Sequence, residues 1–350
     1  MNVEETMLTS IVIKGFRGVK EGSLEGLKKI NVLVGRNNTG KSTVLEAAYL
    51  ALSVSGDAYA RVVRRRGWYG VATLEQLFYN GGGSCEIALG LGRRVRVVKL
   101  RRGIPIEEHM QGLRDIGLNV KNVGLIEVEV REEGVAKSYF YIDEEGRSEM
   151  FFEGEPKEPP LDAVLVDWEL ARKYGSPEEA YSRMLKMGGV EAKKQLIRVL
   201  SSKIRGVKDV EPLNVHGKWV LHVVQEEAAI PVYSMGDGVK QALSHLMPLL
   251  SLKNTLILLE EPELHQHPGL LELVVNAIVT SCLERNNQAL ISTHSLELVD
   301  ELLRVVGEKE VGDKVALYRL SLTNGVLRAV SYELEEAQKL RKELEYDLRG

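Results

Sequence analysis

The chain has 350 residues, of which 44% are hydrophobic, and this is enough for one large or two ordinary domains with apolar cores. Its net charge of -4 excludes a globally basic binder of nucleic acid or membranes, so any nucleic-acid surface must be local. Cys85 and Cys282 form no Cys-x-x-Cys pair, and no apolar run approaches the roughly 20 residues that span a bilayer. With an acidic, polar N-terminus in place of a signal peptide, these features predict a cytoplasmic protein without a membrane contact.

The first third of the chain predicts short strands and helices. The N-terminal stretch indicates two or three strands around glycine-containing turns, the last of which is the apolar strand Ile30–Val34. Thr43–Ser53 has helical character, and the basic run Arg61–Gly70 is predicted to be a linker. From Cys85 to about Ile142, apolar and polar residues alternate between turn-like glycines, which predicts a hairpin-rich antiparallel subdomain.

The middle of the chain predicts a loop and then helices. The proline-rich run Glu153–Pro160 is typical of a loop at a subdomain boundary. A helix is expected to open at Ser176, which can cap it, with Pro177 in the first helical position, and to break at Gly188 and Gly189. Sustained heptads are absent from this sequence, which excludes a long coiled-coil arm.

From Pro231 onward, apolar strands alternate with helices. The strands Thr255–Glu260 and Gln288–His294 are each followed by a predicted helix, which is typical of a parallel α/β sheet. The strand Ile30–Val34 must join this sheet from far upstream, so the middle of the chain is an insertion into one core. Thr323–Gly325 predicts a hairpin, and a charged helix follows it.

The loop Gly35–Ser42 carries the most informative motif. Its sequence, GRNNTGKS, fits G-x-x-x-x-G-K-[ST] between a predicted strand and a predicted helix. In such a loop, glycines let backbone N–H groups surround phosphates, Lys41 reaches the terminal phosphates and Ser42 ligates magnesium. A turn that caps an ordinary helix is the alternative, and the flanking elements favour a nucleotide site.

Two further strand ends carry polar side chains. LILLEEPE, Leu256–Glu263, ends in carboxylates that can place Glu260 toward magnesium and leave Glu261 facing the water that attacks the terminal phosphate. His294, at the tip of the next strand, is placed to contact the γ-phosphate. A solvated acidic turn and an ordinary core or surface histidine are the alternatives.

The segment YSMGDGVKQAL, Tyr233–Leu243, combines a serine and two glycines with a following helix. Its N–H groups and Ser234 can hold an anion at the helix start. A glycine-rich helix cap is the alternative interpretation.

The sequence contains two other polar clusters. His265 and His267, with Glu263, have residue types that bind metals, but they do not indicate a metal site, because alternate residues of an extended segment point apart. Arg94, Arg96 and Arg102 share one strand face and predict a local positive stripe for a nucleic-acid backbone, with a solvated strand face as the alternative.

Together these motifs resemble those of ABC-type ATPase heads. The Walker A sequence GRNNTGKS, the signature-like SMGDG, the Walker B sequence LILLEEPE and the switch-histidine sequence STHS occur in the order and spacing of that family. The stretches IVIKGFRGV and EEPELHQHP resemble the OLD-type and RecF/SMC-like AAA ATPases in particular. The resemblance does not extend to the Toprim domain of OLD nucleases, so nuclease activity in this chain is not expected.

The resemblance implies an α/β fold with an ABC-ATPase-like P-loop core, an N-terminal antiparallel β subdomain and an inserted β and helical region. Residues 1–350 would form a single ATPase head. Residues 1–84 and 230–350 would be the two core halves, and residues 85–229 an inserted β-rich and helical lid region.

The resemblance also implies roles for individual residues. Two heads would sandwich two ATP molecules with Mg²⁺, and the phosphates would contact Gly35, Asn38, Gly40, Lys41, Ser42 and Thr43. Glu260 and Ser42 would support the metal, and Glu261 would be the general base. The partner head's γ-phosphate would be contacted by Ser234, Gly236 and Gly238, and sensed by His294. Arg17 would lie near the phosphates, with a solvated turn arginine as the alternative, and Gln76 is the candidate for the Q-loop glutamine.

The expected function is an ATP-hydrolysing switch that dimerises head to head on ATP and acts in DNA repair or defence. A clamp on double-stranded DNA and a regulatory subunit for a separately encoded nuclease, toxin or other effector are the alternatives that the sequence leaves open. An ABC transporter subunit fits less well, because of the β-rich insertion and the loosely matching signature.

Overall fold

The computed structural model describes residues 7–65, 70–154, 161–167, 176–342 and 347. The chain forms two compact units, of which the first comprises residues 1–28, 35–163 and 319–330, and the second residues 29–34, 164–318 and 331–350. The P-loop belongs to the first unit, whereas the Walker B and signature segments belong to the second. Within the described ranges, no helix combines the length and the apolar character that crossing a lipid bilayer requires.

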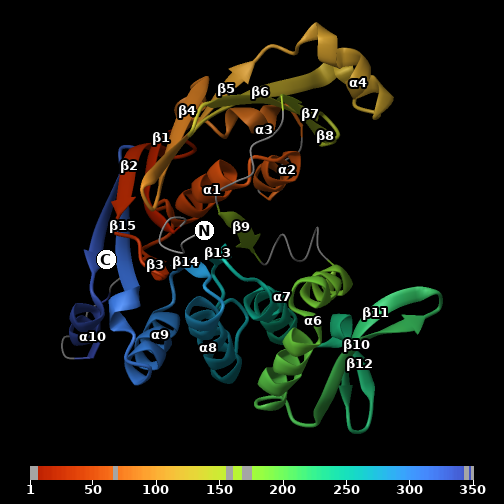
Figure 1. Ribbon diagram of the computed structural model, residues 1–350, viewed down its shortest axis with the longest axis vertical. Coiled ribbons are helices and arrows are strands. Elements are labelled where there is room, and N and C mark those ends of the chain that lie inside the picture. Colours follow the sequence, from red (N-terminus) through yellow and green to blue (C-terminus); the bar gives the residue numbers. More distant parts are fainter. Residues whose placement is uncertain (1–6, 66–69, 155–160, 168–175, 343–346, 348–350) are drawn as a thin grey trace. The chain divides into compact units, whose positions relative to one another are not determined.

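The first unit is built on a largely antiparallel sheet (Figure 1). Its strands follow the order β8-β7-β6-β5-β4-β1-β2-β16, in which only the β2–β16 pair is parallel. The bounds are β1 Leu8–Phe16, β2 Val19–Glu25, β4 Ser84–Leu91, β5 Arg94–Gly103, β6 Val123–Arg131, β7 Val135–Asp143, β8 Ser148–Glu153 and β16 Val326–Tyr332. The prediction of hairpin-rich antiparallel strands over this region is confirmed, with the short helix α4, Met110–Asp115, between β5 and β6.

One face of this sheet packs on the helices α1 (Lys41–Leu52), α2 (Gly56–Arg64) and α3 (Ala72–Glu75) (Figure 1). The opposite face carries charges of alternating sign, because the strand registers align one charged residue from each of seven strands. Two of the resulting ion pairs are Lys14–Glu86 at 3.3 Å and Lys99–Glu86 at 3.2 Å. Across the sheet the row reads Glu21, Lys14, Glu86, Lys99, Glu129, Lys137 and Glu153.

The predicted positive stripe on β5 is wrong. Arg96 is only 1% exposed, and its guanidinium donates to Glu132 at 2.8 Å. Arg94 pairs with the same carboxylate at 3.5 Å, and Arg102 pairs with Glu75 at 2.6 Å. Each of the three arginines therefore has a carboxylate partner, which removes the excess positive charge that a phosphate backbone would need.

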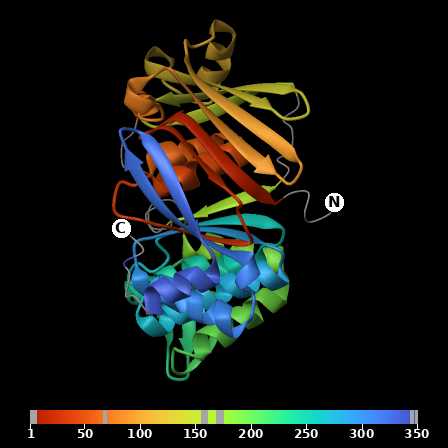
Figure 2. The ribbon, with the colours of Figure 1, turned by 90° about the vertical axis from the view of Figure 1, so that its left-hand side faces the viewer.

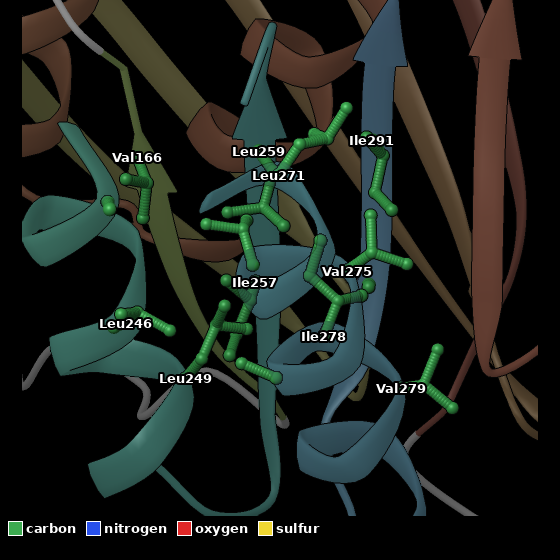
Figure 3. Packing of buried hydrophobic residues seen from close by; sticks show 14 of the residues in the cluster. Val166, Leu246, Leu249, Ile257, Leu259, Leu271, Val275, Ile278, Val279 and Ile291 are labelled. Atoms are coloured by element: carbon green, nitrogen blue, oxygen red, sulfur yellow. The ribbon is translucent and has the colours of Figure 1, made fainter. Parts of the chain in front are cut away.

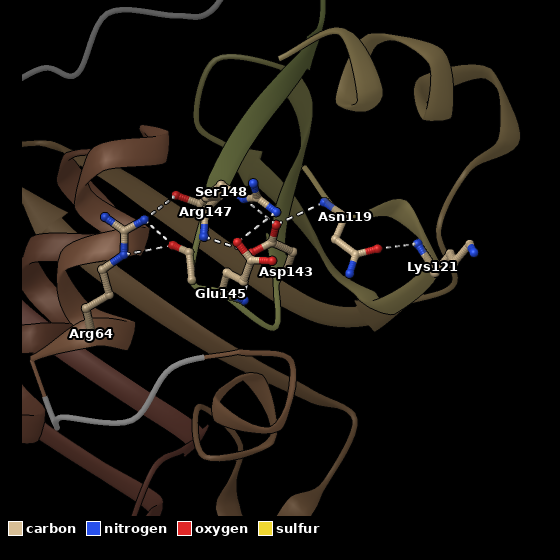
Figure 4. Close-up of polar contacts among 8 residues, drawn as sticks. Arg64, Asn119, Lys121, Asp143, Glu145, Arg147 and Ser148 are labelled. Atoms are coloured by element: carbon tan, nitrogen blue, oxygen red, sulfur yellow. Dashed lines mark hydrogen bonds and ion pairs between the residues drawn. The ribbon is translucent and has the colours of Figure 1, made fainter. Parts of the chain in front are cut away.

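The basic run Arg61–Gly70 is not a linker where the structure describes it. Residues 61–64 belong to α2, and residues 66–69 lie outside the described ranges. Arg64 donates to the carbonyl oxygen of Gly146 and, at 3.2 Å, to Ser148 Oγ, so it joins α2 to the β7–β8 turn (Figure 4). The run of arginines in the sequence suggested a linker, because the acceptors of Arg64 lie more than 80 residues further along the chain.

The same turn is organised by a buried carboxylate, Asp143 (Figure 4). It accepts from the N–H groups of Asn119 at 3.0 Å, Glu145 at 3.0 Å and Arg147 at 2.9 Å, and from Arg147 Nε at 2.8 Å. Burial alone would raise the pKa of Asp143, but the hydrogen bonds from Asn119 and Arg147 outweigh burial and lower it.

The second unit contains the parallel strands predicted for the core. They follow the order β15-β3-β14-β13-β9, and both the β3–β14 and the β14–β13 pairs are parallel, as expected. The bounds are β3 Ile30–Val34, β9 Asp162–Val166, β13 Thr255–Glu260, β14 Gln288–Thr293 and β15 Val315–Thr323; β9 and β15 cross the boundary between the units. The hairpin from β15 to β16 is confirmed, with Asn324 at φ 52° and Gly325 at φ 78°.

Helices pack on one side of these strands (Figures 1 and 2). Their bounds are α6 Pro177–Ser201, α7 Asp237–Ser251, α8 Pro268–Glu284, α9 Leu296–Glu308 and α10 Leu334–Lys342. Branched apolar side chains from α7, α8 and the strands fill the space between them (Figure 3), among them Leu246, Ile257, Leu259, Val275 and Ile291. All five residues of β3 are buried, which explains its uninterrupted apolar sequence.

Helix α6 and a small sheet occupy residues 177–231. Ser176 Oγ accepts from Glu179 N–H at 3.1 Å, which confirms the predicted cap of α6. The predicted break is also confirmed, since Gly189 has φ 62° and ψ -158° inside α6. The three-stranded sheet β10 (Val207–Val215), β11 (Lys218–Gln225) and β12 (Ala229–Pro231) was not anticipated. Residues 155–160 of the proline-rich run lie outside the described ranges.

Candidate nucleotide site

The P-loop, Gly35–Ser42, connects β3 to α1. Gly35, Asn38 and Gly40 all have positive φ, at 152°, 63° and 92°. A Cβ on Gly35 would lie 2.7 Å from the carbonyl oxygen of Leu320, so this position accepts only glycine. Helix α1 begins without a side-chain cap, and its first N–H groups are suited to bind an anion.

Lys41 lies inside this loop. Its side chain is buried, and Nζ donates to the carbonyl oxygens of Gly35 at 2.7 Å and Arg36 at 2.8 Å. The ammonium group therefore lies against the backbone at the start of the loop. Ser42 is half-buried and Thr43 is buried, both in the first turn of α1.

Arg17 belongs to a buried charge cluster in the first unit. Its guanidinium is paired with Glu46 of α1 and donates to Val62 O at 2.9 Å, while Arg65 pairs with the same Glu46 at 2.8 Å. Glu46 has no exposed surface. The alternative of a solvated turn arginine is therefore wrong, because the Arg17 side chain is largely buried and paired with Glu46. This pair fixes Arg17 to α1, the helix that begins at Lys41. Its contact with phosphate stays a prediction.

The second unit brings the three predicted strand ends to one edge of its sheet. Glu260, the last residue of β13, pairs with Ser292 of β14, and Thr293 pairs with Val34 of β3. All three strands are parallel, so their carboxyl ends share an edge. The next residue after β3 is Gly35, and chain connectivity thus starts the P-loop at this edge.

Glu261 and His294 meet directly at this edge. His294 Nδ1 lies 3.1 Å from Glu261 Oε1, and both side chains are partly exposed. Glu261 has φ 45°, a left-handed conformation that non-glycine residues rarely adopt. Its N–H donates to Ser292 O at 2.9 Å, which fixes this conformation against β14.

Glu263 is a partly buried acid that the sequence analysis did not single out for this site. Thr293 Oγ1 donates to Glu263 Oε1 at 2.5 Å and accepts from Ser295 N–H at 2.9 Å. Burial raises the pKa of Glu263, and the hydrogen bond from Thr293 opposes that rise only in part. Glu263 thus ties the turn after β13 to the end of β14. The signal in the sequence was the third carboxylate of EEPE beside a strand ending in threonine.

The signature segment leads into α7. Ser234 and Gly236 are exposed, and Gly236 immediately precedes the helix. A Cβ on Gly238 would lie 2.6 Å from the carbonyl oxygen of His265, so the first turn of α7 sits directly on the backbone that follows Walker B. The structure therefore links the signature to the Walker B turn of the same chain.

Gln76 and His267 lie outside the sheet edge that carries Glu260, Glu261 and His294. Gln76 is exposed after α3, and its Q-loop role stays a prediction. His267 caps α8, since its Nδ1 accepts from Gly269 N–H at 3.3 Å. Among the described residues, no group of histidine, cysteine and acidic side chains has the arrangement of a metal site.

The donor groups fit a magnesium nucleotide. Magnesium prefers oxygen ligands, and the Ser42 hydroxyl and the Glu260 carboxylate supply them. At the sheet edge, the buried Ser292 Oγ has no hydrogen-bond partner within the described residues, so a polar group remains there to be satisfied.

Comparisons with known proteins identify ATPase domains in this chain. Residues 7–90 match the family model described as "AAA ATPase domain", and residues 170–300 match the model described as "AAA domain, putative AbiEii toxin, Type IV TA system". The uncharacterized protein MJECL11 of Methanocaldococcus jannaschii is 32% identical over 116 residues, which are 100% of that protein and 33% of this chain. The ATP/GTP phosphatase of Helicobacter pylori is 22% identical over 352 residues, which cover 90% of this chain and 92% of that protein.

Solved structures show the same fold. The SMC head bound to the C-terminal winged-helix domain of ScpA aligns with a TM-score of 0.57 at 15% identity, over 95% of this chain and 99% of that one. The SMC head with an extended coiled coil, bound to the C-terminal domain of ScpA derived from Pyrococcus furiosus, aligns with a TM-score of 0.53 at 13% identity, over 97% and 99% of the two chains. The chain therefore belongs to the AAA-type P-loop ATPases and has the fold of an ABC-type, SMC-like ATPase head.

Proposed function

We propose that the protein is an ATP-hydrolysing switch that dimerises head to head when it binds ATP. The observation that carries this proposal is the common edge of β3, β14 and β13. That edge gathers the start of the P-loop, Thr293 with His294, and Glu260 with Glu261. These are the parts that phosphoryl transfer to water needs, and the order of the motifs along the chain matches them.

The proposed division of labour follows from the motifs. The P-loop N–H groups and Lys41 bind the phosphates, and Glu261 accepts a proton from the attacking water. His294, paired with Glu261 at 3.1 Å, orients that carboxylate and contacts the γ-phosphate. Ser42 and Glu260 would hold magnesium, which would supply positive charge to neutralise the charge that develops on the phosphate oxygens.

Dimerisation is proposed from the exposed signature. Ser234 and Gly236 lie on the surface before α7, where they are able to reach the γ-phosphate bound by a second head. ATP would then act through its higher affinity for the closed dimer, and hydrolysis would reopen it. The proposal keeps the division into two core halves, residues 1–84 and 230–350, around an inserted region, residues 85–229.

A regulatory subunit that controls a separate nuclease, toxin or other effector is the second candidate. The carboxylate partners of Arg94, Arg96 and Arg102 favour it over a DNA clamp on this sheet. The matched model for residues 170–300 is described for a toxin of a type IV toxin–antitoxin system, and the solved SMC heads bind a separate protein. Both findings support a protein partner for this chain. DNA repair or defence is the proposed biological process.

The test is the mass of Glu261→Gln by light scattering on a sizing column, with and without ATP and magnesium. The proposal expects a monomer that becomes a dimer with ATP, and Ser234→Arg in the same background stays monomeric because the added side chain blocks the signature. A labelled duplex in the same run separates a DNA clamp, which co-elutes, from a regulatory subunit, which does not. An ATP-bound protein of constant mass would refute dimerisation.

A further inference from the structure

Gln241 lies in α7, one turn after the signature glycines, and makes an unusual contact. Its side chain has no exposed surface, and Nε2 donates to the backbone carbonyl oxygen of Glu261 at 3.3 Å. We infer that Gln241 is a positioning residue that couples the signature of a head to the general base of the same head. This inference rests on the proposed function and adds a link between the two ATP sites of the dimer.

The first step of the argument is the conformation of the Walker B turn. Glu261 has φ 45° and His265 has φ 58°, so two non-glycine residues of this short turn are left-handed. Such conformations persist only where the surroundings hold them. The carbonyl oxygen of Glu261 accepts from Leu264 N–H at 3.0 Å as well as from Gln241. Gln241 therefore helps to fix the peptide group that orients the Glu261 side chain.

The second step is that both contacts with the Walker B turn come from one face of α7. Gly238 and Gln241 are three residues apart, and so lie on the same face of the helix. Gly238 packs on the carbonyl oxygen of His265, and Gln241 reaches that of Glu261. Two contacts from one helix face thus hold both left-handed residues.

The third step is that the helix backbone is anchored at Gln241. The backbone carbonyl oxygen of Gln241 accepts from Ser244 Oγ at 2.8 Å and lies 2.8 Å from His245 Nδ1. Burial lowers the pKa of His245 to about 4, so the neutral ring donates to this carbonyl at neutral pH. Because the Gln241 side chain is fully buried on this anchored helix, a displacement of the helix also displaces the amide that contacts Glu261.

In the dimer these contacts connect the two sites. The signature of one head contacts ATP on the other head, while Gln241 carries the position of that signature to Glu261, which serves the first head's own ATP. Engagement at one site therefore orients the base at the other. Loss of the Gln241 donor is expected to slow hydrolysis without weakening ATP binding.

The test compares Gln241→Met, which keeps the volume but removes the donor, with Ser251→Ala, which removes a buried hydrogen bond to Met247 O near the far end of the same helix. For Gln241→Met we expect kcat to fall about tenfold, with the KM for ATP within about twofold and the ATP-dependent dimer retained. Ser251→Ala should keep the wild-type kcat. A wild-type kcat for Gln241→Met would overturn the inference. The inference would also be overturned if kcat fell only together with a higher KM, loss of the dimer and loss of thermal stability.

Gln241→Glu provides a second readout. A protonated carboxyl group donates to the Glu261 carbonyl, whereas a carboxylate does not. The kcat of this variant should therefore fall relative to the wild type as pH rises from about 5 to about 8. A ratio independent of pH would contradict the hydrogen bond's role. Absence of ATP hydrolysis in the wild-type protein would instead overturn the proposed function itself, and the two failures are thereby distinguished.

Discussion

The P-loop and the Walker B turn both follow a parallel strand, and both need left-handed backbone, but they obtain it in different ways. The P-loop places glycines at two of its three such positions, Gly35 and Gly40, and at the third Asn38, a residue type that tolerates this region better than most. The Walker B turn places side chains there, Glu261 and His265. In the P-loop a Cβ at Gly35 would meet the carbonyl oxygen of Leu320 at 2.7 Å, whereas Glu261 keeps a side chain, whose carboxylate is the proposed general base.

This difference shows where the chain tolerates strain. Glycine gives the P-loop its shape at little conformational cost, and the phosphates interact with backbone N–H groups. In the Walker B turn, Glu261 keeps a side chain in a strained conformation, which is held by a hydrogen bond to Ser292 O and by hydrogen bonds from Leu264 N–H and Gln241 Nε2. Neighbouring groups therefore hold the strain at this turn, whereas the P-loop avoids much of it with glycine.

The largest effect should follow from Glu261→Gln. The amide keeps the size of the side chain but does not accept the proton of the attacking water, so ATP hydrolysis should fall by about a hundredfold or more. ATP binding, which depends on the P-loop, should persist. Phosphate release and equilibrium binding of a fluorescent ATP analogue measure the two quantities. Equal loss of both would show that the turn also shapes the phosphate-binding loop.

Gly35→Ala should damage the P-loop in the opposite way. The added Cβ meets the Leu320 carbonyl oxygen at 2.7 Å, and φ 152° is strained for alanine. We expect a loss of about 3 kcal/mol in the free energy of unfolding, together with loss of ATP binding. Urea denaturation and the same binding assay test it, with Gly81→Ala, which meets no atom within 4 Å but also has positive φ, as the control for strain without a clash. Equal effects of the two substitutions would refute the packing argument.

Asp143→Asn probes a turn that is held by a carboxylate without nucleotide chemistry. Because the folded-state pKa of Asp143 is lowered, its stabilisation is present above the unfolded-state pKa and is lost as pH falls through the folded-state pKa. The variant should lose about 2 kcal/mol of unfolding free energy at pH 7, and less as pH falls below about 4. Urea denaturation across pH tests this. A deficit that is constant with pH would assign the effect to geometry alone.

The smallest effect compares Glu261→Gly with Glu261→Ala. Neither variant has the carboxylate, but only alanine keeps the strain at φ 45°. Glu261→Gly should therefore be more stable than Glu261→Ala by about 1 kcal/mol in urea denaturation, although glycine is usually the less stable of the two. The opposite order would mean that the turn relaxes when its side chain is removed.

The sequence by itself determined the elements and the motifs. GRNNTGKS between an apolar strand and a helix, the buried strands before Glu260 and His294, the cap at Ser176 and the break at Gly189 are local features, and all of these elements are found in the structure. Such signals depend on backbone preference and on the spacing of apolar residues, and both can be read within a few residues.

Only the tertiary structure decided which charges and amides meet. The predicted stripe of Arg94, Arg96 and Arg102 failed because Glu132 and Glu75 come from other segments. In the same way, the contacts of Arg17 with Glu46 and of Gln241 with Glu261 join residues 29 and 20 positions apart. A residue's charge and hydrogen-bonding capacity are properties of the sequence, but its partner depends on strand register and helix packing, which long-range contacts fix.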